Sequence, residues 1–218
     1  MERLASATEG LLRAGRRLGE RGLISAGEGN LSTRLDADRL LVTPTGRRKD
    51  ELEPDDLVVV WIGHPGAAGN PPRSRSGLAP TSDLRIHLAV HAARPDIGAV
   101  AHAHLPASMA LTLAGEMPDP TALPETSLLL PRLPYLPFGE MGSAELAGRV
   151  AAALSEAPEP FADAVLLERH GAVAVGAEAG AAVDRLELIE VLCRTWRDAL
   201  LIKAARAAGV RIGGSAPD

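Results

Sequence analysis

The segment Ile97-Gly-Ala-Val-Ala-His-Ala-His-Leu-Pro106 decides how this chain is expected to fold. Its apolar part, Ile97 to Ala101, predicts a buried strand. Side chains two residues apart on a strand point to the same face, so His102 and His104 can reach one point. This geometry suits two metal ligands, although a His-x-His pair at a strand end is also found as ordinary polar sequence.

A third histidine follows another predicted strand. The apolar run Ala164 to Leu167 predicts that strand, and His170 stands directly before Gly171, which favours a turn. Such a turn would present the imidazole at the strand end. Three neutral imidazoles suit zinc, and a site with three protein ligands leaves one position open for a substrate. The sequence therefore indicates Lewis-acid chemistry.

The length of 218 residues suits one domain with a sizeable core, and no linker-like stretch divides the chain. We therefore expect residues 1–218 to form a single domain. The stretch over residues 63–77 is rich in glycine, proline and serine, which predicts one long surface loop.

The composition excludes several functional classes. A net charge of −5 with scattered basic residues does not fit nucleic-acid binding. No apolar run is long enough for a membrane span, and the N-terminal residues lack the apolar core of a signal peptide. The single cysteine, Cys193, excludes an internal disulfide and is expected to be a buried small side chain. We expect a cytoplasmic protein.

The order of the predicted elements indicates an α/β fold with a mixed sheet, because some strands follow one another without a helix between them. Helices are expected at the N-terminus, from a cap at Thr81 or Ser82 to an end before Arg94, and over residues 108–114, 143–154 and 179–208. Strands are expected over residues 40–43, 56–61, 97–101, 164–167 and 171–175. Residues 118–137 are rich in proline and are expected to be irregular or an edge strand.

Asp83 is the carboxylate expected beside the metal, because it begins the helix that leads into the His102 strand. An acidic residue in a first helical turn also interacts favourably with the helix dipole, so both roles stay open. His87 and His91 continue the four-residue spacing from Asp83. Without the glutamate of a zinc-protease motif, the pair is a weak metal-binding signal, and His87 is interpreted as a hydrogen-bonded core or interface histidine.

Three short segments are suited to bind an anion. They combine glycine with small hydroxyl or amide side chains at residues 29–32, 43–46 and 81–82. Their N–H and hydroxyl groups suit a phosphate, above all at the helix start that contains Thr81 and Ser82. Thr43-Pro-Thr-Gly46 is also an ordinary turn sequence. None of the three matches a P-loop or a dinucleotide-binding motif.

Taken in order, these motifs resemble those of the class II aldolase/adducin family. They are Gly29-Asn-Leu-Ser32, Thr43-Pro-Thr-Gly46, Pro80-Thr-Ser-Asp83, Arg94-Pro-Asp96, Val100-Ala-His-Ala-His104, Leu133-Pro-Tyr135 and Leu166-Leu-Glu-Arg-His-Gly171. The resemblance implies a three-layer α/β/α sandwich around a mixed, mostly antiparallel central sheet. It also implies a homotetramer with its sites at subunit interfaces.

The resemblance implies roles for single residues. One Zn²⁺ per subunit would be bound by His102, His104 and His170, with Asp83 as the catalytic carboxylate. The substrate and its phosphate would be bound by Asn30, Thr45, Gly46, Thr81 and Ser82. The implied activity is that of a zinc-dependent lyase, an aldolase that cleaves or forms a carbon–carbon bond in a small sugar phosphate such as fuculose 1-phosphate. A metal-stabilised enediolate would be the intermediate.

Departures from the family pattern leave other reactions open. Asp83 stands where fuculose-phosphate aldolases have glutamate and where the epimerases have aspartate. Residues 115–133 contain no counterpart of the aldolases' proton-donating tyrosine; Tyr135 comes later, and Glu125 is a candidate replacement. No histidine follows His170 to complete an epimerase pair. A sugar-phosphate 4-epimerase, a decarboxylase or dehydratase, and a non-catalytic adducin-like association module are therefore alternatives. The sequence identifies neither the substrate nor the stereochemistry.

Overall fold

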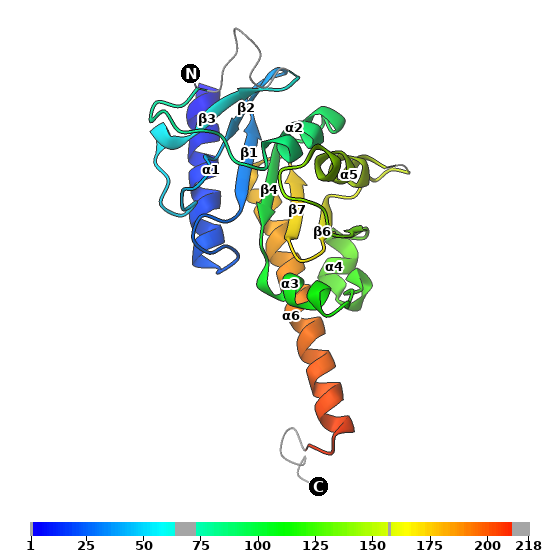
Figure 1. Ribbon diagram of the computed structural model, residues 1–218. Helices are drawn as coiled ribbons and strands as arrows, with labels where there is room; N and C mark the ends of the chain where they lie inside the picture. The colour runs from blue at the N-terminus through cyan, green and yellow to red at the C-terminus, as the bar shows by residue number, and fades with distance from the viewer. Residues whose placement is uncertain (1, 64–72, 157, 211–218) are drawn as a thin grey trace.

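A seven-stranded sheet forms the centre of the computed structural model, which describes residues 2–63, 73–156 and 158–210 (Figure 1). The strand order is β3-β2-β1-β4-β7-β6-β5. Only β5 and β6 are parallel; the other neighbours are antiparallel. The strands are β1 (Asn30–Arg34), β2 (Arg39–Val42), β3 (Val58–Trp61), β4 (Ala99–Ala103), β5 (Tyr135–Leu136), β6 (Ala164–Leu167) and β7 (Gly171–Gly176).

Helices pack on both faces of this sheet and complete the predicted three-layer sandwich. One face packs against α1 (Glu2–Glu20) and α6 (Ala179–Ala207), and the other against α2 (Leu84–Ala93) and α5 (Ala144–Ser155). The C-terminal half of α6 extends past the edge of the sheet (Figure 1). The shorter elements are α3 (Pro106–Leu113), α4 (Pro124–Leu129) and the 3₁₀ turns η1 (Pro54–Asp56) and η2 (Pro120–Ala122).

The central strand β4 divides its side chains between the two layers. Ala99, Ala101 and Ala103 belong to the core that includes α1 and α6, where their small size lets the helices approach closely. Val100 belongs to the core with α2 and α5. Because side chains alternate along a strand, His102 points to the same face as Val100 and therefore towards the α2 layer.

The pairing of β4 with β7 brings distant parts of the chain together. Ala103 near the end of β4 pairs with Ala172 near the start of β7. The turn between β6 and β7 is short, because Leu167 already pairs with Gly171. His170 lies in this turn and is therefore carried to the end of β4.

Several predicted elements require correction. The sequence does not predict β1, and Asp56 ends η1 instead of beginning a strand. Asp83 is the N-cap of α2, so the prediction that Thr81 or Ser82 caps this helix is wrong. The proline-rich segment contains a short helix, α4, as well as the edge strand β5.

Other expectations concern burial and the membrane. Cys193 is fully buried, as predicted. Among the described helices, none combines the length and the apolar character that crossing a membrane would require. The loop expected over residues 63–77 falls mostly on residues 64–72, which lie outside the described ranges.

Gly98 is required for the close approach of two sheet segments. A methyl group built there would overlap the backbone carbonyl of Ala177, whereas one on Gly148 of α5 would meet no atom within 4 Å. We expect Gly98→Ala to lower the free energy of unfolding by about 1–3 kcal/mol. The matched Gly148→Ala should raise it by about 0.5–1 kcal/mol, because alanine favours helix. Urea unfolding measures both, and an unchanged midpoint for Gly98→Ala would contradict the close approach.

Candidate active site

The three predicted histidines lie together at the junction of β4 and β7. The side chains of His102, His104 and His170 each offer a ring nitrogen within 4.8 Å of the others. Their ring centroids are 4.7–5.0 Å apart. His102 and His170 are buried, and His104 is partly exposed. The spacing argument therefore identified a real cluster, and the cluster could hold a metal ion.

Gly171 makes this convergence sterically feasible. Its φ of +94° is in the left-handed region that disfavours side chains. A methyl group at this position would also overlap the carbonyl oxygen of Ala103 and crowd the Cα atom of His104. Glycine after His170 thus allows the turn to approach the end of β4.

The hydrogen bonds of the cluster leave ring nitrogens without partners. His102 Nδ1 lies 2.9 Å from the carbonyl oxygen of Ala172, so this nitrogen carries the proton and donates. His102 Nε2 and both ring nitrogens of His170 are buried without a hydrogen-bond partner in the described part of the chain. Buried polar atoms are rarely left unpaired. A nitrogen-binding divalent ion such as zinc fits this set of donors.

Burial keeps these rings neutral. It lowers the pKa of His102 to about 3, with further contributions from His170 and His104. The pKa of His170 is also lowered, first by burial and then by His104. A metal binds the deprotonated ring nitrogen, so both side chains are in the ligand form at neutral pH. His104 Nδ1 lies 3.7 Å from a carboxylate oxygen of Glu28.

Asp83 lies beside the cluster with one oxygen occupied. Its Oδ2 accepts a hydrogen bond of 2.9 Å from the Asn30 amide nitrogen, and its Oδ1 is buried without a partner in the described ranges. Burial on its own would raise the pKa of this carboxyl group. The neighbouring His102 and the Asn30 hydrogen bond oppose burial and hold the pKa below its ordinary value. Asp83 is therefore ionised, with Oδ1 available.

A chain of buried side chains continues from Asn30 between β1 and α2. Asn30 Oδ1 lies 2.6 Å from His87 Nε2, and His87 Nδ1 lies 2.7 Å from Ser32 Oγ. Ser32 Oγ is also 2.9 Å from His91 Nε2, and His91 Nδ1 is 3.3 Å from Arg34 Nη2. The prediction that His87 is a hydrogen-bonded core histidine is confirmed, and His91 proves to be one as well.

The donors of this chain all point towards Asp83. The Asn30 nitrogen donates to Asp83, so the Asn30 oxygen must accept from His87 Nε2–H. His87 Nδ1 then accepts from the Ser32 hydroxyl, and Ser32 in turn accepts from His91 Nε2–H. Burial lowers the pKa of His87 to about 4, against the charge of Asp83, and burial also lowers the pKa of His91. Neutral rings are what this arrangement requires.

The predicted anion-binding segments lie next to one another. Pro44 pairs with Pro80, and the Thr81 N–H donates to the Thr43 carbonyl. Thr45, Gly46 and Ser82 are exposed, whereas Thr81 is buried. Whether any of these residues binds a ligand stays a prediction. For Asn30 the prediction also stays open, although Asp83 and His87 engage both ends of its amide.

Lys49 was not singled out from the sequence. Its side chain is almost fully buried, and Nζ donates to the carbonyls of Gly27 and Arg47 at 2.7 and 2.6 Å. Burial lowers the pKa of Lys49 to about 8, against the charge of Asp83. The lysine thus ties the loop that contains Gly46 to the loop that leads into β1. Nothing in the sequence of Arg47-Arg-Lys49 distinguishes it from its exposed neighbours.

Comparisons with known proteins agree with this geometry. The family model described as the class II aldolase and adducin N-terminal domain matches residues 9–197. Methylthioribulose-1-phosphate dehydratase of Acidiphilium cryptum is 32% identical over 202 residues, which cover 87% of this chain and 89% of the relative. The 5-methylthioribulose-1-phosphate/5-deoxyribulose-1-phosphate aldolase of Rhodospirillum rubrum is 33% identical, with 86% and 79% covered.

A solved structure supports the same relationship. L-fuculose-1-phosphate aldolase of Thermus thermophilus superposes with a TM-score of 0.74 at 28% identity. The match covers 94% of this chain and 98% of that one.

We expect His102→Ala to abolish stoichiometric zinc binding, because the cluster loses its most buried nitrogen donor. Elemental analysis after zinc loading and dialysis should give about one zinc per chain in the parent protein and almost none in the variant. His87→Gln is the matched control and should retain zinc. Full zinc content in His102→Ala would remove His102 from the ligand set.

The hydrogen-bond directions predict the tautomers of two rings. Nitrogen-15 NMR should find the proton of His87 and of His91 on Nε2, since Nδ1 accepts in both. Ser32→Ala removes the acceptor of His91 and the donor to His87, so the ring signals of both should shift. Residue Ser108 is also buried and provides a serine-to-alanine control that should leave these signals in place. A proton on Nδ1 of His87 would reverse the assigned directions.

Proposed function

Because this chain belongs to the class II aldolase and adducin family, we propose that it is a metal-dependent lyase, and specifically an aldolase, acting on a ketose 1-phosphate. The main support for the proposal is that several buried side-chain atoms without hydrogen-bond partners lie close together. Asp83 Oδ1 and the free nitrogens of His102 and His170 are buried side-chain atoms without partners in the described residues. A base beside a three-imidazole cluster is the arrangement that carbon–carbon cleavage next to a carbonyl requires.

His102, His104 and His170 would hold one zinc ion per subunit. When bound, the ion supplies a Lewis acid that polarises the carbonyl group of the substrate. The unprotonated Nε2 of His102 is fixed in this form by the hydrogen bond from Nδ1 to Ala172.

Asp83 would exchange a proton with the reacting carbon. Cleavage between C3 and C4 releases the C4 hydroxyl proton, forms an aldehyde and leaves the electron pair on the three-carbon phosphate fragment. The ionised Asp83 Oδ1 would take up this proton and then deliver it to C3 of that fragment, which leaves as dihydroxyacetone phosphate. Asn30 holds Oδ2, which leaves Oδ1 free for the substrate.

Thr45, Gly46, Thr81 and Ser82 would bind the phosphate group. The two segments adjoin at the Pro44–Pro80 pairing, and Gly46 has a φ of +68°, a left-handed conformation that occurs in anion-binding turns. Binding energy at the phosphate positions the distant carbons. Asn30 would add at most the second N–H of its amide, because its other groups are engaged by Asp83 and His87.

The relatives favour one second reaction, dehydration. A relative at 32% identity is named as a dehydratase of methylthioribulose 1-phosphate, and another at 33% as an aldolase of the same compound. In dehydration, Asp83 would remove the C3 proton while the C4 hydroxyl group leaves. We therefore propose that five-carbon ketose 1-phosphates are better substrates than fuculose 1-phosphate. We also propose that the protein is a homotetramer in the cytoplasm, with its sites at subunit interfaces. A neighbouring subunit could then supply a proton donor in place of the tyrosine that this chain lacks.

Phosphorus NMR tests the reaction directly. The zinc-loaded protein is incubated with 5-deoxyribulose 1-phosphate or with fuculose 1-phosphate, and a chelator-treated sample is the control. Aldol cleavage should produce dihydroxyacetone phosphate, and the chelator should stop it. A new phosphate ester without dihydroxyacetone phosphate would support dehydration instead. Unchanged spectra from the zinc-replete protein with both compounds would contradict the proposed aldolase.

Asp83→Asn should lower kcat about 10²- to 10⁴-fold, because the amide cannot carry the proton. The zinc content should stay near that of the parent protein, since the three histidines remain. Asp119→Asn, an exposed change of the same kind, should leave kcat unaltered. Turnover of Asp83→Asn at the parental rate would assign proton transfer to another group.

A further inference from the structure

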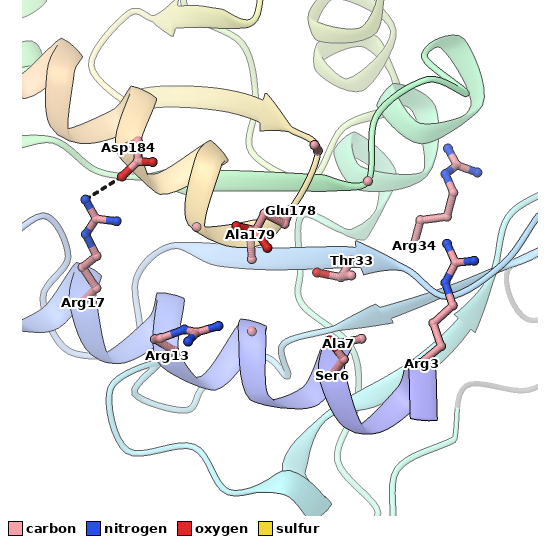
Figure 2. A pocket seen from close by; sticks show the side chains of 14 residues that line it. Arg3, Ser6, Ala7, Arg13, Arg17, Thr33, Arg34, Glu178, Ala179 and Asp184 are labelled. Atoms are coloured by element: carbon pink, nitrogen blue, oxygen red, sulfur yellow. Dashed lines mark ion pairs between the residues drawn. The ribbon is translucent and has the colours of Figure 1, made fainter. Parts of the chain in front are cut away.

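A pocket lies at the opposite end of β1 from the histidines (Figure 2). Its volume is about 490 Å³, and it is lined by one side of α1 from Arg3 to Arg17, the end of β1 and the beginning of α6. Asn30 pairs with His102, whereas Thr33, which lines the pocket, pairs with Ala99. Three residues of strand span about 10 Å. Within this chain the pocket is therefore separate from the candidate active site.

The lining of this pocket is rich in arginine. Four arginines face two carboxylates: Arg3, Arg13, Arg17 and Arg34 against Glu178 and Asp184. Arg17 is neutralised, because it pairs with Asp184 at 2.6 Å and also with Glu187. The other three arginines make no ion pair with any described residue. Figure 2 shows Arg3 and Arg34 at one end of the pocket and Arg13 further along α1.

Arg34 is held in place with part of its guanidinium group unused. Nε donates to the Ile97 carbonyl, and Nη2 donates to backbone carbonyls of α2 and its C-cap. Nη1 makes no hydrogen bond within the described ranges. Burial lowers the pKa of Arg34, and the charge of Arg3 adds to this, although Asp96 opposes both. The Asp96 carboxylate is itself bound by Arg94.

Thr33 adds an uncharged group that also lacks a partner. Its Oγ1 is buried and makes no hydrogen bond in the part of the chain that the structure describes. A buried hydroxyl group without a partner is unusual in a folded protein. The pocket thus combines unpaired guanidinium groups with a hydroxyl that can donate or accept, which is the donor set that phosphate oxygens require.

We propose that this pocket is a second anion-binding site, which takes an elongated phosphate-bearing small molecule. One phosphate group binds Arg3, Arg34 and the Thr33 hydroxyl. Arg3 and Arg13 are ten residues apart on a helix, or about 15 Å. A second anionic group of the same ligand therefore reaches Arg13, and the pocket has the volume for the atoms between them. The proposal does not depend on the lyase activity.

Protein NMR with two probes tests the site. Inorganic phosphate and tripolyphosphate are titrated into the full-length protein against sodium chloride of equal ionic strength, and the backbone amides of Gly98, Ala179 and Gly180 are followed. Arg3→Gln should weaken the binding of both probes about tenfold or more at these amides, as expected for loss of a charge-assisted hydrogen bond. Arg13→Gln should weaken only tripolyphosphate.

The control is Arg16→Gln, which removes an exposed charge from the same helix outside the pocket. It should bind both probes like the parent protein. Arg34 is left intact, because it also belongs to the hydrogen-bonded chain that ends at Asp83. The proposal is wrong if the three amides do not shift saturably, or if Arg3→Gln binds as tightly as Arg16→Gln. Equal tripolyphosphate binding by Arg13→Gln would overturn the elongated ligand.

Discussion

The pairing of β4 with a strand on each side is the constraint on which the candidate site depends. On one side, β1 places Asn30 opposite His102. On the other, β7 begins directly after His170 and pairs Ala172 with Ala103. The carboxylate of Asp83 comes from the start of α2, and its hydrogen bond with Asn30 of β1 holds it at the site. A shift of either pairing by one residue would turn Asn30 or His102 to the opposite face of the sheet.

Because the polar groups of the site are buried, their hydrogen bonding constrains this arrangement. Between β1 and α2, hydrogen bonds are both donated and accepted by the four side chains inside this chain, which offsets the cost of burying them: His91, Ser32, His87 and Asn30. The unpaired atoms are concentrated elsewhere. Half of the buried side-chain nitrogen and oxygen atoms without partners in the described residues belong to His102, His170 and Asp83. The fold thus satisfies the polar side chains between β1 and α2 and leaves unpartnered ligand atoms where a metal and a substrate would lie.

The sequence predicted the parts of the site that follow simple periodicities. The two-residue spacing of His102 and His104, and an apolar run before His170, were sufficient to place three imidazoles together. The same reasoning missed β1, because Asn-Leu-Ser-Thr-Arg contains only one apolar residue. One face of this strand packs against polar side chains of α2 instead of an apolar core. Hydrophobic patterns cannot detect a strand that is buried by hydrogen bonds.

Asp83 shows why the usual rule for helix capping failed at the start of α2. An aspartate at an N-cap ordinarily accepts a hydrogen bond from the first turn of its helix, which contributes about 1 kcal/mol. Asp83 is the N-cap of α2, but its side chain makes no such bond. It turns instead towards Asn30, and Thr81 Oγ1 accepts the Asp83 N–H. The helix therefore begins without side-chain capping from its own N-cap, because the carboxylate is used between Asn30 and the histidines. Such departures from local preference are expected where function sets the conformation.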